Sequence, residues 1–265
     1  MTRPGKVSGL HAETPLRAAA ERLLQARLAD VHAAEARALR RLDPETIHDL
    51  RVACRRLRAA VKMFGKKRLR ALDGRIEHLQ DALGEVRDLQ LQVQWLKRHR
   101  GDARRVHARL RKGEAHLRQA LAFWSRRSEP QVLRALSHVR SGGTLGGPRT
   151  RKRLRKRLRQ LEEALAVSDP LEPAAAHRIR VAAKKLRYEA ELLRDAIDLE
   201  EVLDLLSDLQ TTLGEVHDAD VRLEEFGAEQ KLVRAARAER RRRATKARAL
   251  LRRFSRVASS LKRRL

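Results

Sequence analysis

The sequence predicts an all-α protein made of two four-helix bundles that are related by internal duplication. Three observations support this fold class. Apolar residues recur at helical spacing, alternating runs of Val, Ile and Thr are missing, and two motifs each occur twice at nearly the same offset. The 265 residues and the 42% hydrophobic content are enough to build a core.

The apolar spacing places four helices in each half of the chain. We expect helices over residues 15–41, 45–64, 68–98 and 102–127, then over 150–166, 173–198, 200–226 and 229–263. A segment with four glycines and a proline separates the halves, because these residues disfavour a continued helix. The predicted organisation is a tail over 1–14, a first half over 15–140, a linker over 141–149 and a second half over 150–265.

A basic helix that contains a histidine occurs once in each half. The segment HDLRVACRRLR, which begins at His48, matches HRIRVAAKKLR, which begins at His177, 129 positions later. Pro44 and Pro173 each lie four residues before the histidine, as suits proline in the first turn of a helix. Asp43 is a natural N-cap for the first copy.

A second motif follows each basic helix. The segment LQDALGEVRD, which begins at Leu79, matches LQTTLGEVHD 130 positions later. Its glycines, Gly84 and Gly214, each cost ~1 kcal/mol in a helix relative to alanine, so we expect close helix contact or a bend there. Four acids accompany them: Glu85, Asp88, Glu215 and Asp218. They could gather a metal ion, but without a Glu-x-x-His motif we expect them to orient the arginines through ion pairs, and we predict no metal site.

The basic residues of each repeat form a stripe on one helix face, beside a parallel apolar stripe that can pack into a bundle. The two stripes are His48, Arg51, Arg55, Arg58 and Lys62, and His177, Arg180, Lys184 and Arg187. The second stripe ends sooner because Glu191 occupies the place of Lys62. Like charges at this spacing destabilise a helix unless an anion relieves them, and cations ~5 to 6 Å apart suit a chain of phosphates.

An isolated basic stripe is usually a solvated helix face, but duplication in the same phase favours a binding site. The two histidines could instead cap or hydrogen-bond within the core. If they take part in binding, their protonation should strengthen it as the pH falls through ~6.5.

Composition narrows the classes of function. The formal net charge of +28 calls for an anionic partner, and 3% aromatic residues count against base stacking on single strands. The single cysteine, Cys54, excludes an intramolecular disulfide, and residues 1–14 do not form a signal peptide. We expect a cytoplasmic protein without a membrane partner. Motifs for a phosphate-binding loop, a zinc protease or a nucleophile elbow are missing, so we expect neither catalysis nor a cofactor.

The duplicated patterns, each a histidine-containing basic helix followed by Leu-Gly-Glu-Val-x-Asp, resemble the CHAD family, the conserved histidine α-helical domain. The likeness runs from about residue 15 to the end of the chain. It implies two four-helix bundles related by a pseudo-twofold axis, a basic groove or cavity, and binding of inorganic polyphosphate, in some members at polyphosphate granules. Some relatives also carry a triphosphate-tunnel catalytic domain, for which this chain has no room, and this favours a binder over a hydrolase.

The resemblance implies polyphosphate contacts in both halves: His48, Arg51, Arg55, Arg56, Arg58 and Lys62 in the first, and His177, Arg180, Lys184, Lys185 and Arg187 in the second. Arg56 and Lys185 match basic positions of the motif but point about 80° or more away from several stripe residues. The main alternative is a non-specific nucleic-acid-binding architectural protein, which needs little beyond arranged cations. A protein of anionic membranes is a weaker reading, because bulky aromatics do not flank the charges.

Overall fold

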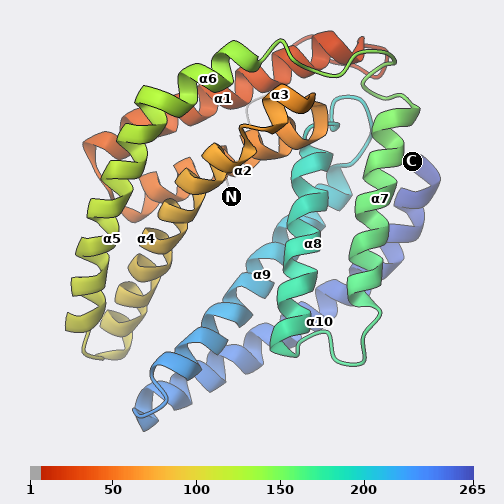
Figure 1. Cartoon of the computed structure of the whole chain (residues 1–265). Helices are drawn as coiled ribbons and strands as arrows, with labels where there is room; N and C mark the ends of the chain where they lie inside the picture. Colours follow the sequence, from red (N-terminus) through yellow and green to blue (C-terminus); the bar gives the residue numbers. More distant parts are fainter. Residues whose placement is uncertain (1–6) are drawn as a thin grey trace. The chain divides into compact units, whose positions relative to one another are not determined.

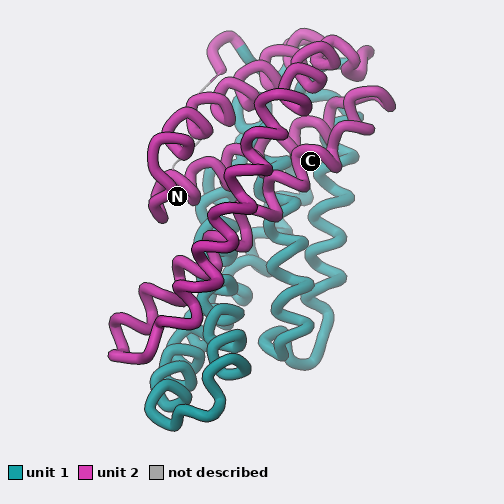
Figure 2. The backbone as a smooth tube through the Cα atoms, turned by 60° about the vertical axis from the view of Figure 1, so that its left-hand side comes forward, with its two compact units in different colours: residues 1, 10–13, 143–265 teal, residues 2–9, 14–142 magenta. Residues whose placement is uncertain are grey.

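The computed structural model describes residues 7–265, and its regular elements there are helices, with no β-strand (Figure 1). The prediction of an all-α protein is confirmed. The chain separates into two compact units, one formed by residues 14–142 with 7–9 and the other by 143–265 with 10–13 (Figure 2). The division falls inside the glycine-rich segment, where Gly142 and Gly143 have φ angles of 82° and 84° that favour glycine. The pseudo-twofold relation and the basic groove stay predictions.

The unit built on residues 14–142 contains α1 (Leu16–Arg40), α2 (Pro44–Phe64), α3 (Lys67–Arg70), α4 (Asp73–His99), α5 (Arg104–Phe123), a π-helical turn η1 (Trp124–Ser128) and α6 (Glu129–Ala135). Helix α2 packs against α1 and α4, and α4 packs against α5. Two details differ from the expected four helices. A turn after Arg70 separates α3 from α4, and the last helix continues through η1 into α6. Pro130 explains the wide π-helical turn, because it has no N–H to donate to a carbonyl one turn earlier.

The other unit contains α7 (Pro148–Leu165), α8 (Pro173–Glu191), α9 (Glu200–Glu225) and α10 (Gln230–Arg264). These helices pack in chain order, α7 against α8, α8 against α9 and α9 against α10. Helix α8 ends at Glu191 rather than at the expected 198, and the turns that follow bury Leu193 and Ile197. None of the described helices has both the length and the apolar character that crossing a membrane requires.

The starts and the buried faces of α2 and α8 determine how the basic stripes are presented. The Asp43 carboxylate accepts hydrogen bonds from the backbone N–H groups of Glu45 and Thr46, at 3.0 and 2.9 Å, so the predicted cap is confirmed. Glu172 caps α8 in the same way. The predicted apolar stripes are buried throughout: Ile47, Leu50, Cys54, Leu57, Val61 and Phe64 on α2, and Ala176, Ile179, Ala183, Leu186, Ala190 and Leu193 next to and on α8. On each helix the basic stripe therefore lies on the face next to the buried apolar stripe.

Candidate functional site

The basic stripe of α2 runs along the edge of the buried face. All five of its residues are partly exposed, neither buried in the core nor fully in solvent: His48, Arg51, Arg55, Arg58 and Lys62. Side-chain exposure is 20% for Arg51, 14% for Arg58 and 42% for Lys62. Long cationic side chains in this position can pack their methylene stems and keep their charged ends in contact with water.

The C-terminal end of this stripe is held by acids of α4. Arg58 donates from Nε and Nη2 to the two oxygens of Asp73, at 2.8 and 3.1 Å, and it also pairs with Glu77. The Lys62 ammonium lies 3.1 Å from Asp73 Oδ2. Two cations and two carboxylates thus offset each other here, and an incoming anion would have to displace the carboxylates.

At the N-terminal end of the stripe, positive charges predominate around His48. Arg51 Nη1 lies 3.8 Å from Asp88 Oδ1, which is a long ion pair, and Arg87 donates to the Pro44 carbonyl at 3.1 Å. Burial lowers the pKa of His48 below 6.5, and the charges of Arg87 and Arg51 lower it further while Asp49 opposes them. The imidazole is therefore neutral at neutral pH, in a setting that already attracts anions.

The α8 stripe begins with the same arrangement. His177 is exposed, and Arg180 and Lys184 are partly exposed. The His177 ring lies 5.9 Å from the ring of His217 on α9. Burial lowers the pKa of His217, and the nearby charge of Arg180 contributes in the same direction. A histidine pair thus occupies the place that His48 and Arg87 occupy in the first half.

Arg187 has a structural environment. Its side chain is 4% exposed, donates from Nε to Gln210 Oε1 at 3.0 Å and from Nη1 to Glu191 Oε1 at 2.6 Å, and lies over the Tyr188 ring. Arg56 and Lys185 were also predicted as polyphosphate contacts. Arg56 is buried on α2, whereas Lys185 is exposed on α8. A ligand could reach Arg187 or Arg56 only if neighbouring side chains moved.

The acids of the second motif differ from the expected pattern. Asp88 does pair with Arg51, but Glu85 contacts His116 of α5 at 3.5 Å and Glu215 contacts Arg243 of α10 at 3.1 Å. Two of the four acids thus pair with residues outside the stripes, because α4 and α9 each also pack against a following helix.

The expected close contact at the motif glycines is not found. A Cβ atom at Gly84 would meet only the Arg51 guanidinium, at 3.9 Å, and one at Gly214 would meet nothing within 4 Å. Both glycines lie inside unbroken helices. Their effect is to leave α4 and α9 without a side chain at these positions, next to Arg51 in the first half.

Sequence reasoning missed the basic residues on α4 and α9 that complete each cluster. Arg87 and His217 occupy the variable position of Leu-Gly-Glu-Val-x-Asp, and both lie near the histidine of their stripe. The signal was present in the sequence, since that position is basic in both repeats. Asp73 and Glu77 carried no comparable signal, because neither belongs to a repeated segment.

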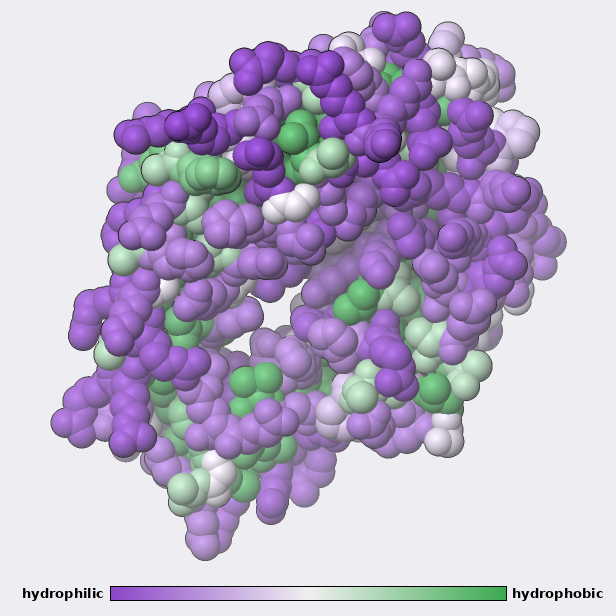
Figure 3. Space-filling view, in the orientation of Figure 1, coloured by the Kyte–Doolittle hydropathy of each residue, from purple (hydrophilic) through white to green (hydrophobic). Residues whose placement is uncertain are grey.

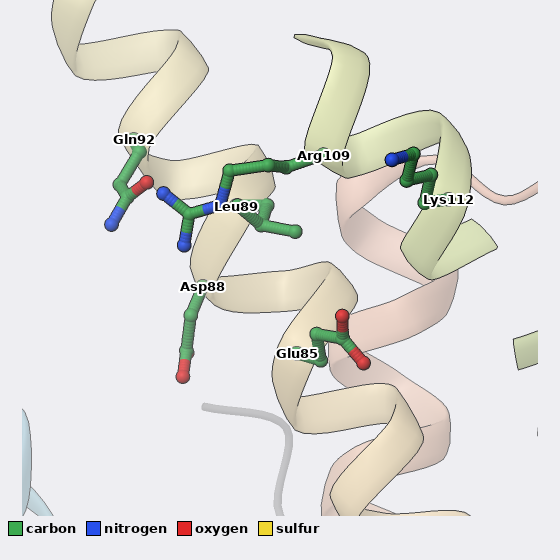
Figure 4. Close-up of a pocket in the computed structure, with 6 residues that line it drawn as sticks. All are labelled: Glu85, Asp88, Leu89, Gln92, Arg109 and Lys112. Carbon is green, nitrogen blue, oxygen red and sulfur yellow. The ribbon is translucent and has the colours of Figure 1, made fainter. Parts of the chain in front are cut away.

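A pocket of about 250 Å³ lies beside this region, between α4 and α5 (Figure 4). Its charged residues are Glu85, Asp88, Arg109 and Lys112, with Leu89 and Gln92 completing the lining. The Arg109 side chain extends toward α4. Because two acids and two bases share the lining, the pocket has no strong preference for an anion, in contrast to the stripe.

Comparisons with known proteins agree with this architecture. A family model described as the CHAD domain matches residues 22–227. The crystal structure of the CHAD domain from the plant Ricinus communis superposes with a TM-score of 0.69 and 23% identity, over 95% of this chain and 96% of the other. PptA from Streptomyces chartreusis superposes with a TM-score of 0.64 and 14% identity, over 93% of this chain and 100% of the other. No curated protein matches the sequence.

Proposed function

The chain belongs to the CHAD family, and on this premise we propose that it binds inorganic polyphosphate, without catalysing a reaction, through the basic stripes of α2 and α8. The proposal includes a cytoplasmic location and association with polyphosphate granules. The binding set has its centre at the N-terminal ends of the stripes and adds one residue from each of α4 and α9. Its members are His48, Arg51, Arg55 and Arg87 in one half, and His177, Arg180, Lys184 and His217 in the other.

One observation carries the proposal: a group of solvent-accessible basic residues recurs in both units on corresponding helices, α2 with α4 and α8 with α9. Arg51 and Arg180 supply planar guanidinium groups that can donate two hydrogen bonds to one phosphate. Histidines beside them can add charge when protonated. An anion whose charges repeat along a chain can satisfy several such donors together, whereas a single phosphate can satisfy few.

The motif glycines add support. Each costs ~1 kcal/mol in a helix interior, and no close packing around Gly84 or Gly214 offsets that cost. Without side chains there, α4 and α9 leave room for a ligand to approach. We infer that this access is the reason for glycine at both positions.

Competition between polyanions tests the proposal. Long-chain polyphosphate is titrated into the protein by calorimetry at fixed physiological salt, with and without duplex DNA of equal total charge, since polyanion affinities depend steeply on salt. We expect polyphosphate to bind tightly and DNA to displace little of it. If DNA displaces polyphosphate at equal charge, the site does not recognise polyphosphate and the proposal fails.

Nucleic-acid binding is the second candidate, and a feature of α10 favours it. Six exposed arginines share an arc of about 100° along this helix, and none forms an ion pair with another described residue: Arg234, Arg237, Arg241, Arg248, Arg252 and Arg256. The face of the molecule in Figure 3, a different view from this row, is mostly hydrophilic, with small hydrophobic areas between the polar side chains. An exposed row of arginines can contact the phosphates of a duplex without base specificity.

We expect polyphosphate affinity to rise as the pH falls through 6.5 and to continue rising below it. The pKa values of His48 and His217 are lowered in the free protein, mainly by burial. A bound polyanion favours the charged imidazoles and raises these pKa values, so binding takes up protons. As the pH falls, the affinity begins to increase near the raised pKa that the histidines have in the complex. The increase is complete only below the lowered pKa that they have in the free protein.

The measurement is calorimetry between pH 7.5 and 5.0, with His48→Gln/His177→Gln/His217→Gln as the reference variant. The parent should gain affinity over this range and the triple variant should gain much less. A flat parent profile would exclude the histidines from the binding set. Long polyphosphate chains are used because their weakly acidic terminal phosphates, which could also take up protons, are then a small share of the ligand.

A further inference from the structure

A second group of polar side chains, none of them part of a basic stripe, lies where α1 approaches η1 and α6. His32 and Glu35 come from α1, and Glu129 is the first residue of α6. Their ligand atoms all lie within 4.8 Å of one another. We propose that His32, Glu35 and Glu129 bind a divalent transition-metal ion of the zinc class.

The spacing of the donors fits three ligands of such an ion. His32 Nδ1 lies 3.2 Å from Glu129 Oε1, close to the separation of about 3.3 Å between neighbouring ligands in a tetrahedral site with bonds of 2.0–2.1 Å. His32 and Glu35 are three residues apart on α1 and so share one face of the helix. One imidazole and two carboxylates leave a fourth position for water. The His32 side chain is 72% exposed, which gives an ion a route from solvent.

The buried carboxylate is the strongest reason to expect a cation. Glu35 is 3% exposed, and no lysine or arginine of the described chain forms an ion pair with it. Its hydrogen bond comes from the Ser125 hydroxyl. Burial raises the pKa of Glu35, and the charge of Glu129 adds to this effect, against the hydrogen bond from Ser125 and the charge of His32. A buried carboxylate beside a second, partly exposed one is destabilising unless a proton or a cation balances them, and one divalent ion would balance both.

The π-helical turn contributes two further observations. η1 places Ser125 against Glu35, as a group that would hold the carboxylate in position behind a metal ion. The hydroxyl of Ser128, next to Glu129, is completely buried and has no hydrogen-bond partner among the described residues. A buried polar atom in this state needs an explanation, of which a bound water or ion is one, and single π-helical turns are common at functional sites.

Cobalt(II) is the probe for the test, because it replaces zinc and shows strong visible absorption when its coordination is tetrahedral. The full chain is titrated with Co²⁺ in the absence of polyphosphate, which would itself chelate metal, and Zn²⁺ is then added. We expect one Co²⁺ per chain, visible bands that Zn²⁺ removes, and proton release on binding. His32→Ala should remove the bands and weaken binding more than tenfold, and Ser125→Ala should weaken it by about tenfold.

The control is His116→Ala. His116 also contacts a glutamate, Glu85, at 3.5 Å, but no third ligand joins this pair among residues 7–265. This variant should bind Co²⁺ like the parent. Glu35→Gln would test the fold as well as the site because the residue is buried, so the exposed His32 is the decisive position. Absence of the bands in the parent, or equal affinity in His32→Ala, would overturn the proposal. Polyphosphate binding is measured separately on His32→Ala and should be unchanged.

Discussion

The variant Arg51→Glu/Arg180→Glu is expected to bind polyphosphate about a hundredfold more weakly than the parent, or worse. A hydrogen bond to a charged group contributes about 1.5–3 kcal/mol, so losing one such contact in each half removes at least ~3 kcal/mol, which corresponds to a factor of about a hundred. The new carboxylates also repel the ligand. At position 51 the carboxylate would face Asp88, which now lies 3.8 Å from Arg51.

The matched control is Arg118→Glu/Arg178→Glu, which changes the net charge by the same amount. Arg118 is exposed on α5, and Arg178 is exposed on α8, two residues before Arg180 and so on nearly the opposite side of the helix. This control should lose little affinity under the same salt conditions. Equal losses in both variants would mean that net charge alone attracts the ligand, and the stripes would then be ordinary solvated faces.

The second large effect is expected at Glu189, on stability. This glutamate is 3% exposed and accepts hydrogen bonds from Arg153 and Arg157 of α7, at distances between 2.7 and 2.9 Å. Removing the buried partner leaves two guanidinium groups without it. We expect Glu189→Ala to lower the free energy of unfolding by roughly 3 kcal/mol, the lower end for a broken buried pair, because both arginines retain some contact with water.

Chemical denaturation followed by circular dichroism measures this effect, and Glu162→Ala is the comparison. Glu162 of α7 pairs with Lys262 at 2.8 Å, but their side chains are 31% and 57% exposed. Surface pairs contribute about 0–1 kcal/mol, so this variant should unfold almost like the parent. If Glu189→Ala and the parent are equally stable, the arginines of α7 do not depend on Glu189. They would then count as ordinary surface cations.

The starts and the buried faces of the helices that carry the stripes could be predicted closely from sequence. Asp43, Pro44 and Pro173 act locally, and the apolar spacing fixes which face of each helix is buried, so their effects are visible in a short window of residues. The same reasoning ended the fourth helix at residue 127, whereas η1 carries the chain past Pro130 into α6.

It was harder to predict whether each cation of a stripe is paired with another residue of the protein. Helical spacing gives the direction of a side chain but not the residues that face it, and Asp73 and Gln210 approach Arg58 and Arg187 from other helices. One partner was accessible to sequence reasoning: Glu191 lies four residues after Arg187, the distance at which opposite charges pair on a helix. Glu191 was identified from sequence only as the residue at which the stripe ends, and its ion pair with Arg187 was not predicted.

The carboxylates of Asp73 and Glu77 already pair with the cations at the C-terminal end of the α2 stripe. A ligand that occupies the whole stripe must take Arg58 and Lys62 from these carboxylates, so binding there is an exchange rather than a simple addition. A small anion gains too little from such an exchange. A polymer already anchored at His48 and Arg51 presents its next charges at high local concentration, and only it can complete the exchange. These carboxylates would therefore make this end of the stripe bind long ligands in preference to short ones.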